Sequence, residues 1–472
     1  MYKEKLLEIG LNDLLYIIIG MIPLVLLFKN NFTIAGLVIG VYGVVFLSSK
    51  ILNSKKYESF MRYYLTKKRI TDIRKKSKIG VTDFKSTSVF LDMKNQELCL
   101  PDTVIEIQEH AFYGKKMEYI KGSGVIKISQ GSFEACHELK AFSFPKLKFI
   151  GADAMKFCSS LEKINMPNIK IIGENAFWYC TNLKEVIVGN NLEKIEKSAF
   201  DNCEKIKAIE LPDTVVRIGA SAFEASGLKN IIIPSMINIV ENCTFARTPL
   251  EKVTLINNHV SISARAFFQC EKLDSINWDH IDSIGEYSFR SCAFEEIRLV
   301  NISNIPKGAF AYNKHLEKVE FVKDNIVLDD EAFWGDYQLR TISSQYITSI
   351  GKQALAYTDV EELWFENLSR IGEQAFVGAK RLKNIFIKCS ADSLQVGKGI
   401  FDECISLQQV WIYFDGNVDF EIDAFPPIGY SIYVLNGSAL DKWVKENSIT
   451  AIISVTPEVM ERKWKEFLMH HI

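Results

Sequence analysis

Cysteine is the residue type with the most chemical potential in this chain, because a thiolate can bind a metal, attack a substrate or enter a disulfide. Ten cysteines occur among the 472 residues. Seven share one place in a repeated pattern, three residues after a recurring Phe or Met: Cys136, Cys158, Cys180, Cys203, Cys270, Cys292 and Cys404. With one cysteine per repeat and no pair at zinc-finger spacing, the pattern predicts a column of small buried side chains. Stacked disulfides or metal ligands are the alternative, and free thiols would suit a reducing compartment.

Other residues with catalytic potential do not form a recognisable constellation. The seven histidines are scattered over different repeats or lie at the end of the chain: His110, His137, His259, His280, His315, His470 and His471. No Walker loop, GxSxG, HExxH or repeated DxD motif occurs. The near balance of 56 basic and 58 acidic residues does not favour a dedicated nucleic-acid binder. We therefore expect a non-enzymatic protein without a metal, a cofactor or a small-molecule substrate.

The cysteines belong to a repeat of about 21–25 residues, and a fixed period in that range predicts a solenoid. Each repeat has an Ile-Gly or similar pair, a small residue followed by Phe, a short loop, and a Leu-x-x-Ile-x-Leu strand. The Phe-equivalent positions are Phe112, Phe133, Met155, Phe177, Phe200, Phe223, Phe245, Phe267, Phe289, Phe310, Phe333, Leu355, Phe376, Phe401 and Phe425. One coil cannot bury its own apolar residues, so neighbouring coils must stack. Glycine after Ile, as at Gly173 and Gly219, is expected to permit a tight corner.

The best-preserved repeats are IGENAFWYCTNLKEVIV (172–188), IEKSAFDNCEKIKAIELP (195–212) and IGEQAFVGAKRLKNIFI (371–387). This pattern resembles the BspA-type (Treponema-type) leucine-rich repeat family, over about residues 98–453. The resemblance implies a mainly β, curved right-handed solenoid of about 15 coils with a parallel sheet on its concave face. It also implies a binding role, commonly adhesion at a cell surface, and no catalysis.

The N-terminus is expected to form a membrane hairpin (1–49), because two apolar runs, about 11–28 and 32–48, flank a short polar turn. A re-entrant hairpin is the alternative, and the second run argues against a signal peptide. A basic juxtamembrane helix or linker (50–85) follows. Its charges predict contact with anionic lipid, or else only set the topology: Lys55, Lys56, Arg62, Lys67, Lys68, Arg69, Arg74, Lys75 and Lys76. The positive-inside rule then places the repeat domain in the cytoplasm.

The repeat solenoid (86–428) should present alternate strand residues on its concave face. The last three strands carry aromatic residues there, each two positions after a polar one: Glu362 and Trp364, Asn384 and Phe386, Gln409 and Trp411. We expect these aromatics to form a continuous exposed column that binds a partner. Alternatively, the C-terminal cap (429–472) buries the column. That cap should include a helix near 438–447 and a tail helix from residue 457 that either caps the solenoid or docks elsewhere.

Together these features predict a membrane-anchored scaffold that recognises a protein or peptide partner on the concave sheet. A cell-surface adhesin that binds host protein or glycan is one alternative. A structural protein acting at the membrane surface through its basic stretch is another.

Overall fold

The computed structural model describes residues 78–79, 91–92, 97–421, 423–425, 429–447 and 452–471. The chain divides into two compact units, Met1–Thr71 and Asp72–Ile472, and all described residues belong to the second. The expected hairpin and most of the basic stretch therefore lie outside the described residues, and both remain predictions. Within the described part of the chain, no helix is both long enough and apolar enough to cross a membrane.

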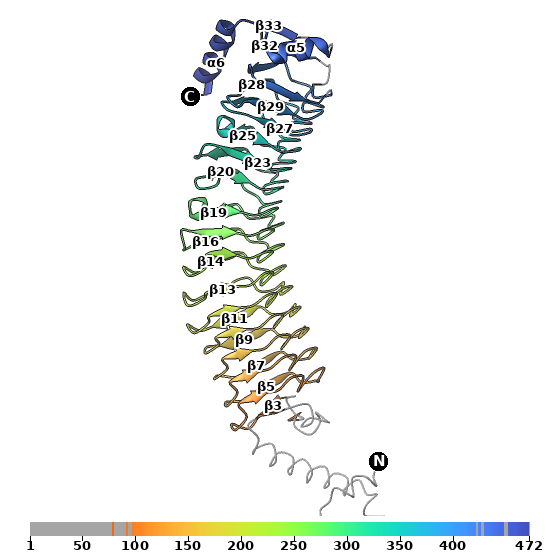
Figure 1. Ribbon diagram of the computed structural model, residues 1–472. Helices are drawn as coiled ribbons and strands as arrows, with labels where there is room; N and C mark the ends of the chain where they lie inside the picture. The colour runs from red at the N-terminus through yellow and green to blue at the C-terminus, as the bar shows by residue number, and fades with distance from the viewer. Residues whose placement is uncertain are drawn as a thin grey trace, which may run out of the picture. The chain divides into compact units, whose positions relative to one another are not determined.

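The second unit is a β-solenoid of about 16 turns in which successive coils add parallel strands to two rows (Figure 1). The first row holds the longer strands: β3 (Glu97–Cys99), β5 (Tyr119–Lys121), β7 (Ala141–Ser143), β9 (Lys163–Met166), β11 (Glu185–Val188), β14 (Asn230–Ile233), β16 (Lys252–Leu255), β18 (Ser275–Ile276), β20 (Glu296–Leu299), β22 (Lys318–Phe321), β24 (Thr341–Ile342), β26 (Glu362–Phe365), β28 (Asn384–Lys388), β30 (Gln409–Tyr413), β32 (Ser431–Leu435) and β33 (Ile452–Val455). This row contains the parallel strands that the repeat pattern predicts, divided among four hydrogen-bonded sheets.

The second row holds mostly shorter strands, which begin just before each Phe turn. Its members are β1 (Lys78–Ile79), β4 (Glu106–Ile107), β6 (Lys127–Ile128), β8 (Phe149–Ile150), β10 (Ile171–Ile172), β12 (Lys194–Ile195), β13 (Arg217–Ile218), β15 (Ile239–Val240), β17 (Val260–Ile262), β19 (Ile281–Ile284), β21 (Asn304–Ile305), β23 (Ile326–Leu328), β25 (Ile347–Ile350), β27 (Arg370–Ile371), β29 (Ser393–Val396) and β31 (Asn417–Phe420). Strand β2 (Leu91–Asp92) instead pairs antiparallel with β3. Because β1 pairs with β4, the sheets begin before residue 86.

The core is a ladder of stacked side chains, with an aromatic ring in every coil except those of Met155 and Leu355. The rings of Phe112 and Phe133 lie 5.0 Å apart and nearly parallel, and those of Phe223 and Phe245 lie 5.7 Å apart at 2°. All four side chains are fully buried. Along the long strands buried and exposed residues alternate, as in β14. The period-based prediction of the core is therefore confirmed.

The turn around each Phe has an unusual backbone, because the residues two positions before and two after it adopt the left-handed conformation. Around Phe200 these residues are Ser198 (φ 51°) and Asn202 (φ 58°). The amides of residues 198, 200 and 202 donate to carbonyl oxygens of the next coil, at 2.9, 2.8 and 2.8 Å. Alternate amides of the turn thus connect neighbouring coils, as strand amides do elsewhere in the solenoid.

The glycines that follow Ile have a different role from the tight corner expected of them. Gly173 and Gly219 do not have a positive φ. A Cβ atom at Gly173 would instead lie 2.6 Å from the backbone carbon of Gly151 in the preceding coil, and one at Gly219 would lie 2.6 Å from the Lys197 nitrogen. These glycines therefore permit close approach between coils.

The predicted cysteine column is confirmed, since all seven members are buried and unpaired. The thiol of Cys203 donates to the carbonyl oxygen of Phe177 at 3.1 Å, and that of Cys136 to the carbonyl oxygen of Phe112 at 3.0 Å. Each thiol therefore satisfies a buried carbonyl of the preceding coil. Burial raises the pKa of the Cys136 thiol to about 12.

The C-terminal cap consists of β32, helix α5 (Ala439–Glu446), β33 and helix α6 (Pro457–His471). The Ser438 side chain accepts a hydrogen bond from the Asp441 amide at 3.1 Å and so caps α5, the helix predicted near 438–447. Strands β32 and β33 continue the long-strand sheet, and β33 pairs in parallel with β32. Figure 1 shows α6 beside the last coils, on the side of the long strands.

Candidate functional site

The predicted aromatic column is present in the last coils. Trp364, Phe386 and Trp411 lie in register on β26, β28 and β30. The rings of Phe386 and Trp411 are 6.5 Å apart at 7°, and Tyr433 on β32 extends the stack, 3.8 Å from Trp411. Register pairing of parallel strands therefore aligns these side chains as the repeat predicted.

The expectation that the column is exposed is wrong. Trp364, Phe386 and Trp411 are 6%, 0% and 6% exposed. Helix α6 covers them, because its Trp464 ring lies 5.7 Å from that of Trp364 and 4.9 Å from that of Phe386. The alternative, in which the C-terminal cap buries the column, describes the structure.

One face of α6 supplies the apolar cover, through residues three and four positions apart. Met460, Trp464 and Phe467 are 0%, 6% and 7% exposed, and the Phe467 ring lies 5.5 Å from that of Phe386. These three residues, the three column aromatics and Leu435 form an apolar cluster distinct from the solenoid core. We call it the α6 cluster. Since the β-sheet separates it from the core, α6 is an addition to the outer face of the sheet.

The polar residues predicted beside the column form a row along its margin. The Asn384 amide donates to the Glu362 carboxylate at 2.7 Å, and the Trp411 indole N–H donates to the Gln409 side-chain oxygen at 3.0 Å. Glu362 is exposed, and Asn384 and Gln409 are half-buried. Their role in partner binding remains a prediction.

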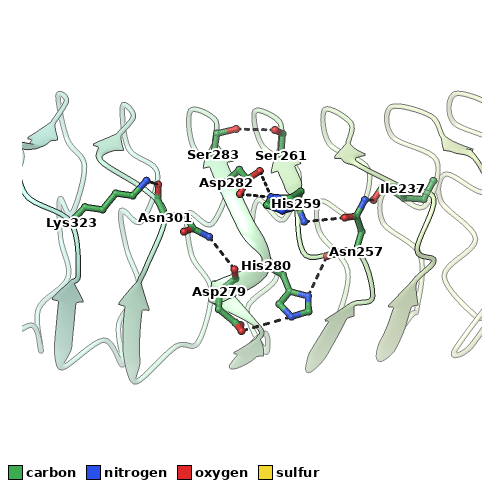
Figure 2. Close-up of polar contacts among 10 residues, drawn as sticks. All are labelled: Ile237, Asn257, His259, Ser261, Asp279, His280, Asp282, Ser283, Asn301 and Lys323. Carbon is green, nitrogen blue, oxygen red and sulfur yellow. Dashed lines mark hydrogen bonds and ion pairs between the residues drawn. The ribbon is translucent and has the colours of Figure 1, made fainter.

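A second polar region lies where loops of successive coils meet, and it holds two histidines with nearby carboxylates (Figure 2). His259 Nδ1 is 3.1 Å from an Asp282 oxygen, and His280 Nε2 is 3.8 Å from an Asp279 oxygen. His280 Nδ1 instead faces the Asn257 carbonyl oxygen at 3.2 Å. Each histidine thus has its own partners, and the two imidazoles do not converge on one reacting atom.

Contacts in this region mainly connect neighbouring coils (Figure 2). The Asn257 amide donates to the Ile237 carbonyl oxygen at 3.2 Å, and the Asn301 amide donates to the Asp279 carbonyl oxygen at 3.0 Å. Lys323 Nζ reaches the Asn301 carbonyl oxygen at 2.6 Å. Throughout the described ranges, no three His, Cys, Asp or Glu residues are grouped so that they could hold a metal ion. The region therefore satisfies backbone carbonyls along one edge of the solenoid.

Sequence reasoning missed a cavity of about 710 Å³, wide open to solvent, on the Phe-turn side of the solenoid. Its lining includes Arg265, Tyr287, Arg290, Tyr312 and Lys314. The three cations come from successive coils, but each stands at a different distance from its Phe. No alignment of the repeats therefore reveals them, and the available signal was a basic residue in three consecutive turns.

The chain was compared with protein families and known proteins. The model of the family described as BspA type Leucine rich repeat region matches residues 59–184, 170–295 and 282–408. No curated protein matches the chain. Among solved structures, a leucine-rich repeat protein from Bacteroides ovatus is similar at 17% identity, covering 70% of this chain and 93% of that one, with a TM-score of 0.43.

Two further solved structures are similar to the chain. A leucine rich cell surface protein from Faecalibacterium prausnitzii is 20% identical, covering 80% of this chain and 87% of its own, with a TM-score of 0.32. The pneumococcal vaccine antigen PcpA is 18% identical, covering 76% and 79%, with a TM-score of 0.32. The family matches extend over most of the sequence, from residue 59 to residue 408. This chain therefore belongs to the BspA-type leucine-rich repeat family.

Proposed function

We propose that this chain is a non-enzymatic scaffold that binds an amphipathic helix of a protein partner on the outer face of β26, β28 and β30. The supporting observation is the α6 cluster, in which a helix of the chain itself fills that face with Met460, Trp464 and Phe467. Recognition of an amphipathic helix by an apolar groove uses anchors three and four residues apart, which is the spacing α6 presents. A partner helix with a similar apolar face would take the place of α6.

Exchange of the two helices requires α6 to be weakly held. Each of its buried anchors contributes on the order of 1.5–3 kcal/mol. Ordering a helix that is otherwise free costs backbone conformational entropy, which opposes this gain. The buried residues of α6 do not belong to the solenoid core. The helix can therefore detach without unfolding the coils.

The test uses a labelled peptide of residues 456–472 as the probe and the full chain as the receptor. The wild-type chain should bind it poorly, because its own α6 fills the face. The Trp464→Ala/Phe467→Ala chain should bind it saturably. Adding Trp364→Ala and Trp411→Ala to that chain should abolish binding, whereas adding Ile232→Ala, on the remote strand β14, should not. Equal binding with and without the column tryptophans would overturn the proposal.

We further propose that residues 1–85 hold this scaffold at a membrane, with the solenoid on the cytoplasmic side. The two apolar runs and the basic residues that follow them support this location. A single labelled cysteine near the C-terminus, in an otherwise cysteine-free chain, should be protected from an impermeant reagent on intact cells. Labelling without permeabilisation would instead place the solenoid outside the cell and favour an adhesin.

A further inference from the structure

We propose that the cavity beside Arg265, Arg290 and Lys314 is a binding site for an acidic saccharide, whose carboxylate or sulfate group contacts these cations. We call it the cationic cavity. It lies on the Phe-turn side of the solenoid and shares no residue with the α6 cluster. The inference is therefore independent of the function proposed above.

Unlike many basic side chains of the solenoid, the three cations of this cavity have no carboxylate partner among the described residues. Many basic side chains elsewhere pair with a carboxylate of the neighbouring coil, as Lys163 does with Glu185 at 2.7 Å. Arg265, Arg290 and Lys314 make no ion pair or side-chain hydrogen bond with another residue in the described part of the chain, and no Asp or Glu lines the cavity. Three unneutralised cations in one concavity create a positive potential that favours an anion.

Aromatic rings lie close to both guanidinium groups. The Arg290 guanidinium carbon lies 4.7 Å from the ring centre of Tyr312 and 5.6 Å from that of Tyr287, and the Arg265 carbon lies 5.4 Å from the same Tyr287 ring. Both arginines therefore stand beside one tyrosine. Stacking on a ring uses the flat face of a guanidinium and leaves its N–H edge available to bind an oxyanion.

The backbone of the Phe turns holds these side chains in a defined arrangement. Arg265, Tyr287 and Tyr312 occupy left-handed turn positions, with φ of 55°, 54° and 62°. The Arg265 amide donates to the Glu286 carbonyl oxygen at 2.9 Å, and the Tyr287 amide donates to the Lys307 carbonyl oxygen at 3.0 Å. Because hydrogen bonds between coils fix the turns, the backbone of the site is formed before a ligand arrives, which lowers the entropy lost on binding.

The remaining lining indicates the class of ligand. Gln269 and Ser291 add neutral hydrogen-bonding groups, and Phe268 adds apolar surface beside the cations. A sugar that carries a carboxylate or sulfate matches this set, since it combines hydroxyl groups, an apolar C–H face and an anion. A simple anion would use only the cations, and a neutral sugar would leave them unpaired.

The test is titration calorimetry of the full chain with four defined probes: a sulfated oligosaccharide, an oligogalacturonate, an uncharged oligosaccharide of equal length, and oligoglutamate. We expect saturable binding of at least one acidic saccharide, weakened by added salt, and no comparable binding of the uncharged one. In the Arg265→Gln/Arg290→Gln chain, affinity should fall about ten- to hundredfold, as expected for loss of charged hydrogen bonds. Arg298→Gln on β20 is the matched charge control, and it should bind like wild type.

Unchanged affinity in the double variant would overturn the site, as would a failure of every acidic saccharide to bind. Tighter binding of oligoglutamate than of either acidic saccharide would overturn the ligand class. The exposed Lys314→Gln chain provides a second test if the double variant does not fold, and it should lose part of the affinity. Arg290→Lys keeps the positive charge but removes the planar guanidinium group. This variant should therefore keep only part of the wild-type affinity.

Discussion

The carboxylate of Asp336 accepts a hydrogen bond from the backbone N–H of Asn313 at 2.8 Å, one coil away. Asn313 occupies the same turn position in its own coil. Its side-chain oxygen accepts from the Cys292 amide at 3.0 Å, while its amide nitrogen donates to the Phe289 carbonyl oxygen at 3.1 Å. Asp336 repeats the first contact, but its second oxygen is buried without a partner.

Asp336→Asn should therefore stabilise the protein at neutral pH, by about 1–3 kcal/mol, because an amide supplies the missing donor. Burial raises the pKa of Asp336 well above its ordinary value. Between the ordinary and the raised pKa, the folded chain binds a proton that the unfolded chain releases, so stability falls as pH rises through this window. Thermal unfolding of both chains at several pH values from 4 to 8 should show the variant's advantage growing with pH. A constant difference across that range would contradict this account of Asp336.

The buried thiols of the cysteine column should be unreactive in the native protein. Because burial raises the pKa of the Cys136 thiol to about 12, almost no thiolate is present near pH 8. Native-state alkylation with N-ethylmaleimide, mapped by mass spectrometry, should modify the exposed Cys99 and spare Cys136 and Cys203. The same reagent should modify all three after denaturation. Native labelling of Cys203 as fast as Cys99 would show that the column opens readily.

Left-handed turn positions that lack glycine offer a direct stability test. Ala225 has φ of 51°, a conformation that is unfavourable for a side-chain-bearing residue by about 1–2 kcal/mol. Ala225→Gly should relieve this strain, with a net gain of up to about 1 kcal/mol, and raise the thermal midpoint. Ala222, in the same turn, is fully buried and has no positive φ. Ala222→Gly should therefore lower the midpoint, and a fall for Ala225→Gly as well would argue against stored strain.

Trp464→Ala should release α6 without destabilising the coils, because the α6 cluster is separate from the solenoid core. We expect faster amide hydrogen exchange across residues 457–471 and stronger binding of an apolar dye at the uncovered column. Exchange in the coils around Phe223 should stay unchanged. The matched control is Met469→Ala, whose side chain is 75% exposed and should have little effect. Faster exchange throughout the solenoid would show that α6 stabilises the coils.

The repeat period predicts what depends on a coil and its immediate neighbours. The Phe ladder, the thiol column and the alignment of Trp364 with Phe386 follow from it, because stacking gives equivalent residues equivalent surroundings. The period does not predict that Trp464, about 100 residues further along, covers Trp364. That contact depends on how the non-repeating tail folds back. The period also does not reveal that Arg265 and Arg290 lie beside the same Tyr287 ring, because the two arginines occupy different positions in their repeats.

The turn around each Phe also has a mechanical consequence. Its amides point along the stack, as those of both strand rows do, so up to three separate sets of bonds join neighbouring coils. A pull along the stack would load all the bonds of a junction at once, whereas a sideways pull on a terminus would break them one after another. Unfolding one coil from the end of the stack would release about 21–25 residues of extended chain. Tension on this chain would therefore be resisted in one direction and absorbed stepwise in the other.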